Sequence, residues 1–264
     1  MRYCSLGSGS RGNATLIESG RTRLLVDCGF SLRSTEQRLA LAGVSPDQLT
    51  AVLVTHEHSD HIKGVERLAR RYQLPVYMTP GTLQAFGANE LSVELIQLER
   101  NFVIDDIQVT PVPVPHDARE PCQFVFDNGQ HRLGVLSDTG SITPLIVEMY
   151  SKLDALFLEA NYDPHMLAQG PYPAFLRARV GGHLGHLSNQ QAASLLQLID
   201  KDVLKHVAIA HISEKNNTPE LALGELSKVL DGWPGELRLA VQNQGLPWQD
   251  ITGNTHHQLA LFGS

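Results

Sequence analysis

The 264-residue chain lacks several features that mark specialised classes of protein. Its three cysteines, Cys4, Cys28 and Cys122, are too few and too scattered to form a disulfide framework. It contains no run of about 18 apolar residues that could form a transmembrane helix. Its first residues also lack the basic-then-apolar layout of a signal peptide. We therefore expect a cytoplasmic protein with reduced thiols.

Positive charge is scarce as well. The chain has 21 lysines and arginines against 28 acidic residues, which gives a net charge of -7. The strongly basic surface that is usual in nucleic-acid binders is absent, and this argues against strong non-specific binding. A local basic path is still compatible with the composition. Two bound divalent cations would also add about four positive charges at one place.

Apolar residues are arranged in patterns that predict alternating strands and helices. The runs at 14–19 and 22–29, joined by Gly20-Arg21, are typical of a β-hairpin. The run at 51–56 predicts a short buried strand, and the helical spacing of apolar residues after Gly64 predicts an amphipathic helix. Further strands are expected to end at or near His116, Asp138, Asn161 and His211.

These elements indicate two β-sheets with helices on their outer faces. Ser188 with Gln191 forms a capping-box pattern, and Thr218-Pro219 is typical of a helix start. Because no linker divides the chain, we expect one domain over residues 1–252. Residues 253–264 are expected to form a tail.

The segment VTHEHSDHIKG, at 54–64, contains three histidines and two acids within six positions. Such side chains are costly to bury unless they are paired, whereas zinc and similar ions use imidazole nitrogen and carboxylate oxygen as ligands. His56 and His58 can face one ion, and Asp60 and His61 can reach a second. Additional ligands must come from other strand ends, and the candidates are His116, Asp138 and His211.

The motif THEHSDH resembles the H-x-H-x-D-H signature of the metallo-β-lactamase fold superfamily. The resemblance implies an α/β fold, the four-layer αββα sandwich with two mixed sheets flanked by helices, and a site along one sheet edge. It implies that Asp27 lies outside the metal ligands and orients one of the ligand histidines. It further implies a first metal bound by His56, His58 and His116, a second bound by Asp60, His61 and His211, and a bridging Asp138.

Four other segments, SLGSGSRGN, EANYDPHML, GHLSN and HISEKNN, resemble the YycJ/WalJ branch of this superfamily. This resemblance implies a 5′-to-3′ exonuclease that acts on DNA in preference to RNA. Related β-CASP nucleases carry a large insert between the fourth ligand and the last. Only 72 residues separate Asp138 from His211, so that insert is not present in full.

The expected reaction is hydrolysis of a phosphodiester. Two cations about 3.5–4 Å apart would activate a water molecule, with Asp60 as a ligand and proton acceptor. His186, just before a predicted helix, is a candidate for holding or protonating phosphate, and His183 is a poorer one. Alternatively, these histidines only bond the helix start. Arg177 and Arg179 either grip phosphates or lie exposed on one face of a strand; Asn161 is a further substrate-binding candidate.

Two alternatives to a nuclease remain open at this point. The same site could hydrolyse a small ester, thioester or cyclic phosphodiester, because both reactions use metals to polarise an oxygen. A non-catalytic metal-binding protein is a third interpretation, against which the complete ligand set argues. Histidine-rich ligation suits Zn²⁺, although mixed nitrogen and oxygen ligands also accept Mn²⁺ or Fe.

The tail contains QLALF, at 258–262, which resembles the Q-L-x-L-F peptide that docks bacterial polymerases and repair proteins on the sliding clamp. The composition of GNTHH before it is typical of a linker, and chain ends are commonly accessible. The alternatives are an apolar terminal strand or a tail folded back on the domain. The residues expected to contact the clamp are Gln258, Leu259, Leu261 and Phe262.

Overall fold

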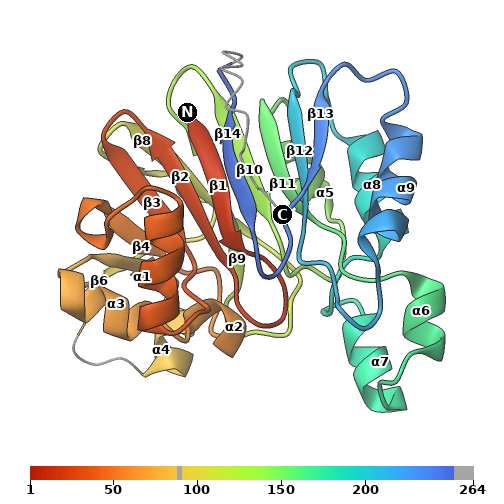
Figure 1. Ribbon diagram of the computed structural model, residues 1–264, viewed down its shortest axis with the longest axis horizontal. Coiled ribbons are helices and arrows are strands. Elements are labelled where there is room, and N and C mark those ends of the chain that lie inside the picture. Colours follow the sequence, from red (N-terminus) through yellow and green to blue (C-terminus); the bar gives the residue numbers. More distant parts are fainter. Residues whose placement is uncertain (88–90, 253–264) are drawn as a thin grey trace, which may run out of the picture.

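The structure is a computed structural model that describes residues 1–87 and 91–252. Two β-sheets face each other and helices cover their outer faces (Figure 1). From edge to edge, the first sheet contains β14 (Leu246–Asp250), β1 (Arg2–Gly7), β2 (Ala14–Ser19), β3 (Thr22–Val26), β4 (Ala51–Leu53), β5 (Val76–Met78) and β6 (Val93–Leu95). The second contains β13 (Glu236–Leu239), β12 (His206–Ala210), β11 (Ala155–Glu159), β10 (Arg132–Leu136), β9 (Cys122–Asp127), β8 (Ile107–Pro113) and β7 (Phe102–Ile104).

Each sheet has its own group of helices. The helices that follow strands of the first sheet are α1 (Leu32–Leu41), the 3-10 helix η1 (Pro46–Gln48), α2 (Ser59–Ile62), α3 (Val65–Tyr72) and α4 (Pro80–Phe86). Those that follow strands of the second are α5 (Pro144–Met149), α6 (Pro164–Gln169), α7 (Ala174–Val180), α8 (Asn189–Leu198) and α9 (Pro219–Val229). No helix within the described residues is both long and apolar enough to cross a lipid bilayer.

Three apolar layers hold this arrangement together. Successive residues of a strand point to opposite faces, so Leu16 of β2 packs under the helices while Ile17 packs between the sheets. On the other sheet, Val207 of β12 packs against α8 and α9, and Ala208 faces the space between the sheets. Both faces of the central strands are therefore buried, which makes the four-layer αββα sandwich expected from the sequence. That expectation is confirmed.

Local sequence signals explain several boundaries. β2 and β3 form the expected hairpin, with Ser19 paired to Thr22 across the two-residue turn and Gly20 at a φ of 55°. α8 begins with the expected capping box, in which Ser188 and Gln191 each satisfy the other's backbone N–H. Thr218 caps α9, with a proline in its first turn.

The segment with two arginines is a helix, and its interpretation as a strand was wrong. Arg177 and Arg179 belong to α7, which starts after Pro173 and ends at Gly181. The alternation of apolar and basic residues suggested a strand, but Ala, Leu and Arg all have high helix propensity. A preceding proline and a following glycine are also common at helix ends. The helix places these arginines on a segment that projects from the sandwich.

Candidate active site

Most of the expected site residues follow the ends of six strands at one edge of the sandwich. Asp27 follows β3, the histidine motif follows β4, and His116 follows β8. Asp138, Asn161 and His211 follow β10, β11 and β12. Three of them, Asp27, Asp138 and His211, have left-handed backbones with φ of 61°, 48° and 49°. Such backbones are costly for residues other than glycine and tend to cluster at functional sites. The chain therefore turns sharply at these strand ends and brings the side chains together.

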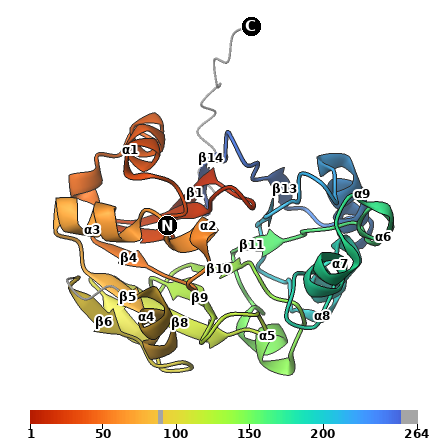
Figure 2. The ribbon, with the colours of Figure 1, turned by 90° about the horizontal axis from the view of Figure 1, so that it is seen from below.

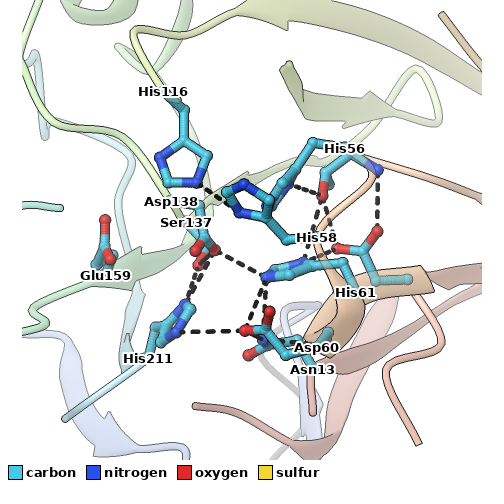
Figure 3. A network of polar contacts seen from close by, with 12 residues as sticks. Asn13, His56, His58, Asp60, His61, His116, Ser137, Asp138, Glu159 and His211 are labelled. Carbon is cyan, nitrogen blue, oxygen red and sulfur yellow. Dashed lines mark hydrogen bonds and ion pairs between the residues drawn. The ribbon is translucent and has the colours of Figure 1, made fainter. Parts of the chain in front are cut away.

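His56, His58 and His116 form one compact group. Each offers a ring nitrogen within 4.8 Å of the others. His56 and His116 are almost completely buried, and the three rings meet edge to face, with centroids 4.6–5.0 Å apart. Figure 3 shows them on one side of a larger polar network. This is the trio expected for the first metal.

Asp60, His61, Asp138 and His211 form the other side of the network. Nε2 of His61 lies 3.5 Å from Oδ2 of Asp60 and 3.3 Å from Oδ2 of Asp138. Oδ2 of Asp138 lies 2.9 Å from Nδ1 of His211. Asp138 also lies in one group with His56 and His61, so its carboxylate stands between the two sides (Figure 3). That position suits the bridging role expected from the sequence.

Asp27 lies just behind this network. Its Oδ2 accepts hydrogen bonds from Nδ1 of His61 at 2.7 Å and from Oγ1 of Thr55 at 2.9 Å. Because that hydroxyl donates to Asp27, it accepts from Nδ1 of His56, also at 2.9 Å. His56 then carries its proton on Nδ1 and turns an unprotonated Nε2 towards the site. His61 keeps a proton on Nδ1 towards Asp27, so its Nε2 also faces the site. This position suits the orienting role expected of Asp27.

The hydrogen-bonding pattern of the first trio fits a cation. Nε2 of His56 is buried without a hydrogen-bond partner among the described residues, although buried polar atoms are rarely left unpaired. Nδ1 of His116 donates to the carbonyl of Gly185 at 2.9 Å, and Nε2 of His58 faces the carbonyl of Asp117 at 3.2 Å. The remaining nitrogens of these two rings thus face each other, 3.2 Å apart, with lone pairs. A bound cation would satisfy all three.

The protonation states also suit metal binding, which requires neutral imidazoles and ionised carboxylates. Burial lowers the pKa of His56 well below its ordinary value and also lowers that of His116. Burial alone would raise the pKa of Asp138, but His211 and His61 hold it well below its ordinary value. Burial alone would lower the pKa of His61, but the carboxylates of Asp138, Asp27 and Asp60 raise this pKa well above its ordinary value. Metal binding would displace a proton from this ring.

The glycine-rich segment near the N-terminus is a tight turn beside the site. Oδ1 of Asn13 accepts a hydrogen bond from the Gly9 N–H at 2.8 Å, while its amide group lies 3.0 Å from Nε2 of His61. Ser8 accepts from the His211 N–H at 2.8 Å. The turn therefore contacts two residues on the same side of the network, His61 and His211.

A cavity of about 400 Å³ opens over the network and collects some of the expected substrate-binding residues. Asn161, Arg179 and His186 line it, together with metal-site residues. Arg179 is held there by an ion pair with Asp117. His183 is exposed and contacts Ser141, outside this lining, and Arg177 is also not among the lining residues. The structure therefore does not bring these two to the cavity.

The sequence interpretation missed Glu159. This fully buried residue ends β11, and its Oε1 lies 2.6 Å from Nδ1 of His186. Burial alone would lower the pKa of His186, but the Glu159 carboxylate raises it to about 9. His186 therefore bonds a carboxylate instead of the start of α8. An acid at the end of an otherwise apolar strand, as in ALFLE, was the available signal.

Comparison with known proteins agrees with this geometry. A family model described as "Beta-lactamase superfamily domain" matches residues 22–212. The chain belongs to the beta-lactamase superfamily. Together with the clustered histidines and carboxylates, membership makes it a metal-dependent hydrolase.

Two relatives of this superfamily member confirm the resemblance to the YycJ/WalJ branch. This chain is 35% identical to exodeoxyribonuclease YycJ of Bacillus anthracis, over 88% of its own length and 89% of the relative's. It is 33% identical to exodeoxyribonuclease WalJ of Streptococcus pneumoniae, over 84% and 85% respectively. Among solved structures, the metallo-beta-lactamase fold protein YhfI of Bacillus subtilis matches with a TM-score of 0.73 at 17% identity, covering 94% of this chain and 98% of that one. That likeness supports the fold.

Proposed function

We propose that the protein is a dinuclear metal-dependent 5′-to-3′ exonuclease that acts on DNA in repair or replication. Support comes from the two relatives named exodeoxyribonucleases, which match over most of the chain. The observation that carries the proposal is that the seven expected metal ligands lie together below a cavity that His186 also lines, with Asp60 joined to the others through His61. Zn²⁺ suits the donor set best, and Mn²⁺ or Fe is also compatible.

In this proposal, His56, His58 and His116 hold one cation, and Asp60, His61 and His211 hold the other, with Asp138 between them. Two bound divalent ions lower the pKa of water and offset negative charge on a phosphoryl group. Asp60 is one of the few ligands with an appreciable exposed fraction, 22% of its side chain, so its carboxylate can accept the proton of an attacking water. Asp27 keeps the ligand histidines in the required tautomer.

His186 is the candidate general acid and phosphate-binding residue in this proposal. Glu159 holds its Nδ1, which leaves Nε2 available to the cavity. With a pKa of about 9, the ring is protonated near neutral pH. It can therefore bind a phosphoryl oxygen and donate a proton to the leaving oxygen. Asn161 and Arg179, which line the same cavity, are positioned to hold the substrate.

The proposal is tested with protein freed of metal and reconstituted with one metal at a time. Single- and double-stranded DNA and RNA are labelled at the 5′ or the 3′ end, and initial rates are compared. Stepwise release of mononucleotides from the 5′ end of DNA is expected. Faster hydrolysis of RNA, or release from the 3′ end, would contradict the assigned substrate or polarity. Turnover of a thioester but of no oligonucleotide would replace the nuclease with the small-molecule alternative.

We also propose that residues 1–252 form the metallohydrolase domain of a cytoplasmic protein and that 253–264 dock it on a sliding clamp. The QLALF motif lies outside the described residues, so this proposal rests on its sequence. A clamp would hold an acidic enzyme on DNA by raising its effective concentration there. The net charge of -7 makes such help useful.

A further inference from the structure

The helical segment between β11 and α8 forms one wall of the active-site cavity. α6 and α7 project from the same lower edge of the molecule as α2, below α8 and α9 (Figure 1), and in Figure 2, which is seen from below, they lie in front of those two helices. Tyr172, Leu176 and Arg179 line the cavity together with His58 and Asp60. A substrate that reaches the metal ligands therefore passes this segment.

This wall carries exposed apolar side chains. Phe175, next to cavity-lining Leu176, is 75% exposed, and Leu184, just after α7, is 53% exposed. Phe175 does not line the cavity itself, but it adjoins Leu176 at the rim, where an exposed apolar side chain can contact a bound ligand. The aromatic ring is the more informative of the two, because a flat, exposed ring can stack on another flat group.

The charge of this segment suits a polyanion. Residues 164–199 include no aspartate or glutamate, although the whole chain contains 28 acidic residues. The same stretch contributes Arg177 and Arg179 on α7. A negatively charged strand therefore meets less repulsion here than over an average stretch of this acidic protein.

The segment is firmly connected to the proton-handling histidine. The carbonyl of Val180, at the end of α7, accepts a hydrogen bond from the His186 N–H at 2.9 Å. A Cβ on Gly185 would lie 2.2 Å from the carbonyl oxygens of Arg179 and Val180, so only glycine fits this close approach. The carbonyl of Gly185 in turn accepts from His116. A group bound on α7 is thus held in a defined position relative to both histidines.

We propose that Phe175 is a stacking platform for an unpaired nucleobase of the substrate strand, beside the phosphodiester that is cleaved. Aromatic side chains bind single strands in this way without sequence preference, because every base has a π face. Inside a duplex, neighbouring bases cover those faces, so the platform receives a base at a strand end or one that has frayed from the duplex. This inference rests on the proposed nuclease function and adds a base-binding residue to it.

The test combines changes in the protein with changes in the substrate. Full-length, metal-loaded wild type is compared with Phe175→Ala, Phe175→Trp and a control, Leu198→Ala, whose side chain is 60% exposed on α8. The substrates are 5′-labelled single-stranded oligonucleotides in which one base at a time, from the 5′ end, is replaced by an abasic site. Initial rates over a range of substrate concentrations that reaches saturation give kcat and KM separately, and the oligomeric state of each variant is determined by light scattering.

Phe175→Ala is expected to lower kcat/KM on the intact strand by roughly tenfold, with the loss in KM, while Phe175→Trp and Leu198→Ala retain activity. At one position, an abasic site should lower the kcat/KM of the wild type by a similar factor. The same abasic site should not lower the kcat/KM of Phe175→Ala any further, because the abasic site and the substitution remove the same contact.

Several results would contradict the proposal that Phe175 is a stacking platform. One is equal activity of Phe175→Ala and Leu198→Ala. Another is an abasic penalty that remains in Phe175→Ala at every position. A change of oligomeric state in Phe175→Ala would instead identify a second copy of the chain as the occupant. If the wild type hydrolysed no oligonucleotide at all, the nuclease proposal itself would fail, and the platform with it.

Discussion

Oδ2 of Asp27 lies 2.7 Å from Nδ1 of His61, and both side chains are almost completely buried. The carboxylate comes from the end of β3 and the histidine from α2, so this contact ties the first turn of the metal motif to the sheet. The same carboxylate reaches His56 through Thr55. One acid therefore determines the orientation of a ligand on each side of the metal network.

Asp27→Asn is expected to weaken metal binding about 10- to 100-fold without unfolding the protein, because the amide cannot accept every hydrogen bond that the carboxylate accepts. Affinity is measured by competition with a chelator, and folding by circular dichroism. Asp154→Asn is the matched control, since Asp154 is a buried carboxylate bonded to Arg132 and Lys205 at the start of β11. Equal affinities in the two variants would show that Asp27 does not orient the ligands.

Asp138→Ala should lower turnover by at least about a hundredfold, on the scale of removing a single catalytic group. The reason is that the Asp138 carboxylate belongs both to a group with His56 and His61 and to a group that contains His211. Initial rates on a 5′-labelled oligonucleotide give the size of the loss. Turnover within about tenfold of the wild type would exclude the bridging role.

Glu159→Gln should move the alkaline limb of the kcat profile to lower pH. A general acid acts only when it is protonated, and the Glu159 carboxylate raises the pKa of His186. Removing that charge lowers the pKa, so the proton is lost earlier as the pH rises. Full pH profiles of wild type and Glu159→Gln provide the comparison.

His186→Ala is the companion variant. It should retain both metals, because His186 is not among the seven expected ligands, yet turn over slowly at every pH. A fully active His186→Ala, or an unshifted limb in Glu159→Gln, would remove the pair from the reaction.

A chain that ends at His257 should lose affinity for the sliding clamp, whereas the full-length chain should bind with a Kd around micromolar, or about −8 kcal/mol. Leu259, Leu261 and Phe262 provide the apolar anchors in this proposal, as a few residues usually dominate an interface. Calorimetry of both chains against the purified clamp measures the difference. Equal affinity, or no binding by either chain, would end the proposal.

The sequence predicted the fold correctly, and it predicted that the expected metal ligands lie close together, because both depend on local patterns. A short continuous apolar run such as the one in β12 indicates a strand buried on both faces, and the spacing of His56, His58, Asp60 and His61 is typical of metal ligands. Glu159 was missed because its importance depends on His186, which is 27 positions away and reaches it only through the packing of α8 beside β11.

The arginine segment was interpreted wrongly for a related reason. The residues of α7 alternate between apolar and basic types, as in a strand, and the helix contains no fully buried residue that would mark a helical stripe. Its position over the cavity is set by contacts far along the chain, such as the ion pair between Arg179 and Asp117. Periodicity alone could not show it.

The most direct test of the two-metal mechanism is the metal content of the reconstituted protein, followed during titration together with turnover. Elemental analysis should give close to two transition-metal ions per chain, with activity rising as the second equivalent binds, because two groups of candidate ligands share Asp138. A single ion per chain that persists after saturating reconstitution, with full activity, would contradict the two-metal mechanism.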